Sequence, residues 1–170
     1  REQIVRACRL MREQEIGVMS FNMVGLPGET YEMARSTVDL NIEAGVDYAM
    51  TMVFQPYPRT RLGDYAVERG WFDGDFERLE SDYYTSSPLE PPHPGDGQRL
   101  QNLQRLFALA VEFPEVRRRL DWLVEKRAPR LYARLFELWH QHCFRRRFYR
   151  IGGPGPRAVA SLLAAIDTRG

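Results

Sequence analysis

The stretch Asn22 to Thr30 reads N-M-V-G-L-P-G-E-T, and it decides how the chain is interpreted. It begins inside a short apolar run, residues 18–24, which stops at Gly25 and is followed by a segment with helical periodicity. An apolar run that ends at glycine and leads into a helix start is typical of a strand, a tight turn and a helix. We therefore predict a strand over residues 17–25 and a helix over residues 29–44.

The same arrangement repeats one helix later. A second apolar run, residues 48–54, leads into F-Q-P-Y-P-R-T at Phe54 to Thr60, and a helical pattern follows over residues 60–69. An amphipathic helix that ends at Gly17 precedes both units. The order αβαβα with short connections predicts parallel strands joined by right-handed crossovers. The fold class is therefore α/β, a piece of a barrel or of an open sheet.

These two turns resemble those of radical S-adenosylmethionine enzymes, in particular the branch that carries an N-terminal cobalamin-binding domain. That family has an apolar-x-Gly-Leu-Pro-Gly-Glu-Thr turn after a late barrel strand, a Pro-x-Pro-Gly-Thr turn after the next, and then a helix ending in Gly and an aromatic. The matching residues are 23–30, 56–60 and 69–72, except that Arg59 stands where the family usually has Gly. The likeness covers residues 1–75, and less specifically the helical tail to about residue 150. It implies the C-terminal part of a partial (β/α) barrel, followed by an α-helical region.

The resemblance also implies a cofactor pocket for S-adenosylmethionine. The family's apolar residue two positions before the first glycine packs on the adenine ring, and here that residue is Met23. Methionine is polarizable and suits an aromatic face, although Met23 could equally be part of the core. The cofactor-binding residues predicted in this way are Met23, Gly25, Gly28, Phe54, Gln55 and Pro56. For Gln55, an ordinary loop contact is an equal alternative.

Glu29 and Thr30 have a structural interpretation. A carboxylate in the first turn of a helix is favoured by the helix dipole, and a threonine is a common N-cap. The phosphate-binding patterns G-x-x-x-x-G-K-S/T and G-x-G-x-x-G are both absent from the sequence. We therefore expect Glu29 and Thr30 to hold the turn rather than to contact a ligand.

The cysteine content sets a limit on what this chain can do by itself. The family holds a [4Fe–4S] cluster on three cysteines of a CxxxCxxC loop, whereas this chain has only Cys8 and Cys143. We therefore expect the C-terminal portion of a longer enzyme, inactive alone, with the cluster loop and any cobalamin domain upstream. It would form the adenine-side wall of the cofactor pocket and part of a cavity for a small-molecule substrate. The substrate, the reaction type, the use of cobalamin and the catalytic residues stay open.

The chain divides into four predicted parts. Residues 1–75 form the barrel portion, residues 76–97 a proline-rich crossing segment, residues 98–150 a helical accessory region, and residues 151–170 a Gly/Pro-rich stop with a short helix. Pro114 and Pro129 each open a helix of the accessory region. We expect two or three helices there, packed by Leu103, Phe107, Leu120, Leu123, Leu135 and Trp139.

Composition excludes several classes of protein. No run of eighteen apolar residues is present, so we expect no membrane span, and two distant cysteines favour a reducing cytoplasm. Residues 1–90 have a net charge of −7 and residues 91–170 a net charge of +8. We interpret the basic half as a solvated or docked helical surface, not a nucleic-acid site.

The spacing of His140, His142 and Cys143 does not suit a metal-binding site. The alternative to an enzyme fragment is a non-catalytic helical interaction module on an α/β scaffold remnant.

Overall fold

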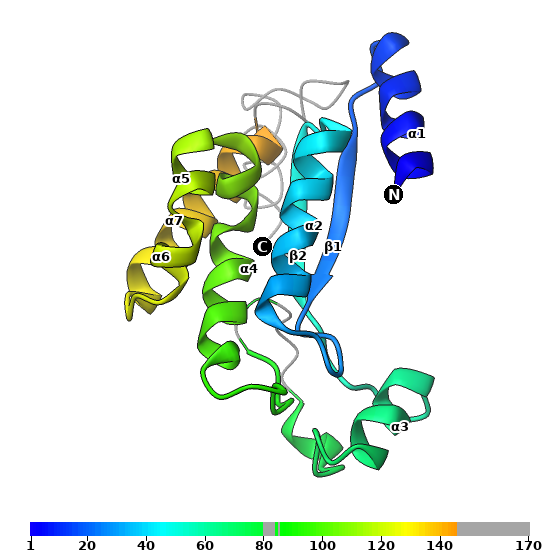
Figure 1. Cartoon of the computed structure of the whole chain (residues 1–170), viewed down its shortest axis with the longest axis vertical. Helices are drawn as coiled ribbons and strands as arrows, with labels where there is room; N and C mark the ends of the chain where they lie inside the picture. The colour runs from blue at the N-terminus through cyan, green and yellow to red at the C-terminus, as the bar shows by residue number, and fades with distance from the viewer. Residues whose placement is uncertain (80–83, 85, 146–170) are drawn as a thin grey trace, which may run out of the picture. The chain divides into compact units, whose positions relative to one another are not determined.

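The computed structural model describes residues 1–79, 84 and 86–145, and within them the chain is mixed α/β with mostly helices (Figure 1). It forms two compact units, residues 1–136 and residues 137–170, which are described separately. The predicted stop and helix at residues 151–170 lie outside the described residues. The elements in chain order are α1 (Glu2–Glu13), β1 (Met19–Val24), α2 (Tyr31–Ala44), β2 (Tyr48–Val53), α3 (Arg61–Glu68), a 3-10 turn (Phe76–Arg78), α4 (Asp96–Glu112), α5 (Pro114–Arg118), α6 (Leu120–Val124) and α7 (Pro129–Cys143).

The strands β1 and β2 pair in parallel, as the sequence predicts. Their register runs from Met19 opposite Tyr48 to Val24 opposite Val53, and α2 makes the connection between them. Within the described residues the sheet has these two strands. The helix ends follow the expected local rules. Gly45 ends α2 in the left-handed conformation with φ 64°, where a residue without a Cβ is favoured.

One face of the sheet is covered by helices. Val24 from β1 and Ala49 from β2 are buried in one apolar core with residues of α2 and α4, and Figure 1 shows these two helices side by side along the sheet. The buried members of this core are Val24, Tyr31, Ala34, Val38, Ala49, Leu100, Leu103, Leu106, Phe107, Ala110, Leu120, Val124 and Tyr132. A smaller core beneath α1 contains Val5, Cys8, Val18 and Ala44. The covered face therefore explains the apolar stripes of α2 and α4.

Polar side chains also lie on this covered face. The Ser20 hydroxyl donates to the side-chain oxygen of Asn41 at 2.5 Å, and the Asn41 amide donates to the side-chain oxygen of Asn22 at 2.7 Å. Asn22 in turn donates to the Ser20 hydroxyl and to the carbonyl of Met50, both at 3.0 Å. This network joins β1 to α2 and to β2, and it satisfies side chains that would otherwise be costly to bury.

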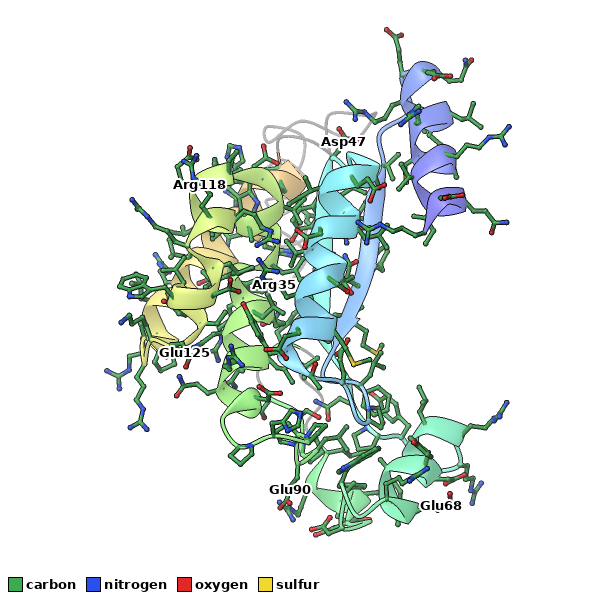
Figure 2. The ribbon with its side chains drawn as sticks, in the orientation of Figure 1. Arg35, Asp47, Glu68, Glu90, Arg118 and Glu125 are labelled. Carbon is green, nitrogen blue, oxygen red and sulfur yellow. The ribbon has the colours of Figure 1, made fainter. Side chains whose placement is uncertain are left out.

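An ionic and aromatic cluster joins α2 to α4 and α6. The Tyr31 hydroxyl donates to the Asp121 carboxylate at 2.7 Å, and Arg35 pairs with the same carboxylate at 2.8 Å. Figure 2 shows Arg35 on the side of α2 that faces α4. Arg99 lies over the Tyr31 ring, 4.1 Å from its centroid. Burial, followed by the contact with Asp121, raises the pKa of Tyr31, so its hydroxyl remains a donor.

The helical tail differs from the prediction in two respects. Four helices, not two or three, occupy the described part of residues 98–148, because the backbone leaves the helical region at Arg119 (φ −105°, ψ 7°) and separates α5 from α6. Leu135 is 36% exposed, so its assignment to the core is wrong. In the part of α7 that belongs to the first unit, Tyr132 is the buried residue, and its hydroxyl donates to the carbonyl of Leu123 at 2.9 Å.

The other residues of the first unit that were predicted to lie in the core do so. Leu103, Phe107 and Leu120 are buried, and Leu123 packs against the same core. Trp139 belongs to the second unit, where it is partly buried and stacks on His142. Among the described residues, no helix is long and apolar enough to cross a membrane.

Candidate functional site at the carboxyl end of the sheet

The turn after β1 is built around two glycines and a buried carboxylate. Gly25 and Gly28 have φ angles of 75° and 80°, which residues with a side chain rarely adopt. The Glu29 carboxylate accepts hydrogen bonds from the backbone N–H of Gly25 at 2.7 Å and of Leu26 at 3.2 Å. The Thr30 side chain caps α2 by accepting from the N–H of Met33. The predicted cap at Thr30 and the turn-holding role of Glu29 are thus confirmed, whereas Glu29 precedes the N-cap and does not lie in the first turn of α2.

Glu29 is only 8% exposed, and this burial has an electrostatic consequence. Loss of water around the carboxylate raises the pKa of Glu29, while the hydrogen bonds from Leu26 and Gly25 act in the opposite direction. Desolvation is the larger effect, because two backbone donors replace only part of a full hydration shell. The turn is therefore held by a carboxylate that is more easily protonated than an ordinary glutamate.

Trp71, in the loop after α3, closes the turn from the outside. A Cβ on Gly28 would lie 2.9 Å from the indole of Trp71, so the ring occupies the space that a side chain would need. The carbonyl of Trp71 accepts a hydrogen bond from the N–H of Glu90 at 2.8 Å. Figure 2 shows Glu90 on the segment between α3 and α4. Trp71 thus links the turn after β1 to this segment.

The face of the sheet opposite the helices is apolar and partly exposed. Phe21 is 65% exposed and Met23 44% exposed, and their partners on β2, Met50 and Met52, are partly buried. Alternation along a strand places these four residues on one side of the sheet, and we call them the methionine face. Met23 is therefore not part of the apolar core of the described residues.

A small cavity lies behind the turn, on the side of the sheet that α4 covers. Its volume is about 190 Å³, and its lining is mostly apolar. Gly25, Gly28 and Glu29 of the turn contribute to it, together with Val53 at the end of β2. The remaining lining residues are Leu26, Ser86, Ser87, Leu89, Glu90, Pro91, Gly97, Leu100 and Gln101. Drug-sized ligands occupy pockets of about 300–1,000 Å³, so this cavity has room for a ring system rather than for a whole nucleoside cofactor.

The predicted cofactor residues do not all meet at one place. Gly25 and Gly28 line the cavity, Met23 lies on the methionine face, and Gln55 lines a second hollow with Arg78, Ser86, Ser87 and Pro88. Phe54 and Pro56 are buried and line neither space. Neither Trp71 nor Arg78 is among the site residues that the sequence predicts. The pairing of Trp71 with Gly28 has a sequence signal, since a glycine–aromatic pair after this helix is part of the pattern that the two turns resemble, whereas Arg78 has none.

The described residues do not fit an iron–sulfur cluster. Cys8 is packed against Val5, Val18 and Ala44 in the small core of the first unit, and Cys143 belongs to the second unit. Within the described part of the chain, no group of three or more His, Cys, Asp or Glu side chains is placed to hold a metal ion. A cluster held by three thiolates needs ligands that these residues do not supply.

Comparison with curated proteins gives one distant similarity. The chain is 29% identical over 66 residues to a protein of Pyrococcus horikoshii described as an uncharacterized methyltransferase. The matched region is 39% of this chain and 14% of that protein. No protein-family model matches the chain, and no solved structure matches it.

Proposed function

We propose that this chain is the C-terminal part of a radical S-adenosylmethionine enzyme and supplies the adenine-side wall of its cofactor pocket. The observation that carries this proposal is the methionine face, which is apolar, open, and leads directly into the glycine turn at Gly25. In a closed or partial (β/α) barrel this face of the sheet is the interior one. We assign residues 1–75 to the barrel and the helices after residue 95 to an accessory region.

The chemistry of the face suits an adenine ring. Thioether sulfur makes favourable contacts with aromatic rings, and Met23 stands beside Met52 on the neighbouring strand. Gly25 follows the last residue of β1 and carries no side chain, so the turn does not obstruct a flat ligand that lies on Met23. Glu29 and Trp71 act indirectly, because they fix the turn that presents Gly25. The proposed role of this chain is to bind and orient the nucleoside.

The iron–sulfur ligands, and cobalamin if it is used, are proposed to lie on a part of the protein outside this chain. When bound, S-adenosylmethionine supplies either a methyl group or a 5′-deoxyadenosyl radical in this class of enzyme. The relative's description as a methyltransferase supports the use of S-adenosylmethionine, a common methyl donor. The substrate is a small molecule whose identity the fold does not select.

The test is equilibrium binding of S-adenosylmethionine to the complete protein with its cluster reconstituted anaerobically. Met23→Asp is expected to weaken binding by roughly tenfold or more, because an unpaired carboxylate facing the adenine loses apolar contact and hydration. Met33→Asp is the matched control, since Met33 is exposed on α2 and belongs to neither the methionine face nor the cavity. The 170-residue chain alone is expected to show no iron–sulfur absorbance.

A third variant separates the methionine face from the cavity behind the turn. Leu89→Trp fills the cavity with an indole and leaves the methionine face unchanged. If the adenine lies on the methionine face, this variant binds S-adenosylmethionine as the wild type does. Loss of binding in Leu89→Trp together with normal binding in folded Met23→Asp would place the ring in the cavity and refute the assignment of Met23.

A further inference from the structure

The cavity behind the glycine turn lies on the side of the sheet opposite the methionine face. Its volume is about 190 Å³, its lining is mostly apolar, and it is partly open to solvent. None of the four residues of the methionine face lines it. An apolar cavity of about 150 Å³ holds a benzene ring. The cavity behind the turn therefore has room for one ring with a small substituent.

Glu29 brings an incompletely bonded carboxylate to this cavity. Both of its backbone hydrogen bonds, at 2.7 Å and 3.2 Å, go to one oxygen, Oε2. The other oxygen, Oε1, has no hydrogen-bond partner among the described residues. Oε1 also keeps accessible surface, because the unpaired side-chain acceptors that are sealed from water in the described part of the chain belong to Thr51, Gln55 and Gln104. A molecule in the cavity can therefore donate a hydrogen bond to Glu29.

The charges around the cavity favour a cation. Among the described residues that line it, Glu29 and Glu90 are the charged ones and none is basic. The pKa of Glu29 is raised, because burial removes more hydration than two backbone N–H groups replace. A positive charge beside Glu29 would stabilise its ionised form. An anion gains little here, since the positive end of α4 already holds the buried carboxylate of Asp96.

We propose that this cavity binds a small planar cation, a single ring that carries an amidinium or a similar N–H group. The ring packs against the leucines of the lining, Leu26, Leu89 and Leu100. One N–H of the cation donates to Glu29 Oε1, and a charge-assisted hydrogen bond of this kind is stronger than one between neutral groups. This inference goes beyond the proposed function, because it assigns a second ligand to the side of the sheet opposite the adenine.

The test compares benzamidine with benzamide, a neutral molecule of nearly the same shape, by ligand-observed NMR titration of the complete protein. Wild type is expected to bind benzamidine about tenfold more tightly than benzamide, because only benzamidine brings a charge to the carboxylate. Glu29→Gln keeps the shape of the side chain but removes its charge, so the preference should disappear. Leu89→Trp fills the cavity and should abolish binding of both probes. Leu10→Trp, at an exposed position of α1, is the matched control and should change neither.

Each outcome supports or refutes the cation site. Equal binding of the two probes to wild type, or no binding of benzamidine at millimolar concentration, refutes it. A preference for benzamidine that persists in folded Glu29→Gln also refutes it. Leu89 lies outside the glycine turn, so Leu89→Trp keeps the test valid even if Glu29→Gln loosens that turn, and unchanged binding in Leu89→Trp would place the probe elsewhere and refute the site.

Competition with the cofactor separates this inference from the proposed function. Saturating S-adenosylmethionine should not displace benzamidine from the reconstituted protein. Displacement would make the cavity part of the cofactor pocket and would overturn the assignment of a second ligand. Normal binding of S-adenosylmethionine to folded Met23→Asp, without displacement of benzamidine, would count against the proposed function and leave the cation site standing.

Discussion

A carboxylate that is withdrawn from water is costly to keep charged, even when hydrogen bonds surround it. At Glu29 two backbone N–H groups compensate in part, and the pKa of Glu29 nevertheless stays above its ordinary value. Glu32, three residues further on, is in the opposite situation. The hydrogen bond from its own backbone N–H, at the start of α2, lowers the pKa of Glu32. The two glutamates should therefore affect stability in opposite directions as the pH changes.

The first prediction follows from this contrast. Between the ordinary glutamate pKa of 4.5 and the raised pKa of Glu29, the folded protein binds more protons than the unfolded one. The free energy of unfolding of wild type, relative to Glu29→Gln, should therefore fall as the pH rises from about 4.5 towards neutral. The same difference measured with Glu32→Gln should rise with pH over the acidic range. Urea unfolding at a series of pH values checks both signs, and a flat or rising difference for Glu29 would contradict the burial effect.

The second prediction concerns Gly28. Gly28→Ala imposes a positive φ on alanine and also brings its methyl group into the Trp71 ring. Gly74 is a matched control, because it has a φ of 83° and its nearest neighbours would be 3.9 Å from a new Cβ. Gly74→Ala should cost about 1–2 kcal/mol of stability from backbone strain, and Gly28→Ala should cost more. Equal losses in the two unfolding free energies would show that Trp71 moves aside freely.

Local sequence signals were sufficient for some of these residues. Gly25, Glu29 and Thr30 act through neighbours within a few positions, so their roles can be inferred from turn and capping preferences. Gln55 contacts Ser86, and Trp71 contacts Gly28. In each pair the two residues lie tens of positions apart in sequence. The contact that decides the role of Gln55 therefore could not be deduced from its own surroundings in the chain.

At the level of elements, helix starts and ends were the most predictable features. The side chain of Thr30 caps α2, and that of Thr60 caps α3 in the same way. Thr30→Ala should lower the free energy of unfolding by about 1 kcal/mol, the usual worth of an N-cap. Ser36→Ala, in the exposed interior of α2, should change it little, because alanine is the better helix former. Thermal or urea unfolding measures the change in stability of both variants. Equal changes would mean that the Thr30 side chain does not stabilise α2 as an N-cap.

In the helical tail, the periodicity of apolar residues does not predict every helix boundary or every buried face. Proline positions located the starts of α5 and α7 correctly, because proline is tolerated in the first turn of a helix. No glycine or proline marks the break between α5 and α6 at Arg119, so the sequence does not predict it. The leucine stripe of α7 likewise suggested a buried face, whereas the part of the helix in the first unit buries Tyr132 instead. Which side of an amphipathic helix is covered depends on its neighbours in space.

For the whole molecule, stability should depend most on the core shared by the sheet, α2, α4 and α6. Leu120 has no exposed surface in that core, so Leu120→Asp should destabilise the protein by several kcal/mol, the cost of burying an unpaired carboxylate. Leu131 lies in the first turn of α7 and is largely exposed, so Leu131→Asp should have little effect. Thermal unfolding midpoints report both changes. An unchanged midpoint for Leu120→Asp would mean that α6 does not belong to the core.

The α/β class and the parallel pairing of β1 and β2 could be derived from the alternation of apolar runs and helical stripes. The contact between Tyr31 and Asp121 could not, because it joins residues 90 positions apart. The hollow around Gln55 depends in the same way on the path of the segment between α3 and α4. Proline content identifies that segment as a connection but does not specify its course.

The polar network of Ser20, Asn22 and Asn41 has a consequence for misfolding. Sliding β1 by one residue along β2 would turn Phe21 and Met23 towards the helices and would deprive the Asn41 amide of its two partners on β1, Ser20 and Asn22. The shifted pairing buries more apolar surface but loses buried hydrogen bonds. It is therefore less stable, relative to the observed register, than it would be for a purely apolar strand. The network therefore favours the observed register of β1 and β2 over the shifted one. It keeps the methionine face directed away from the helices, where the proposed cofactor could reach it.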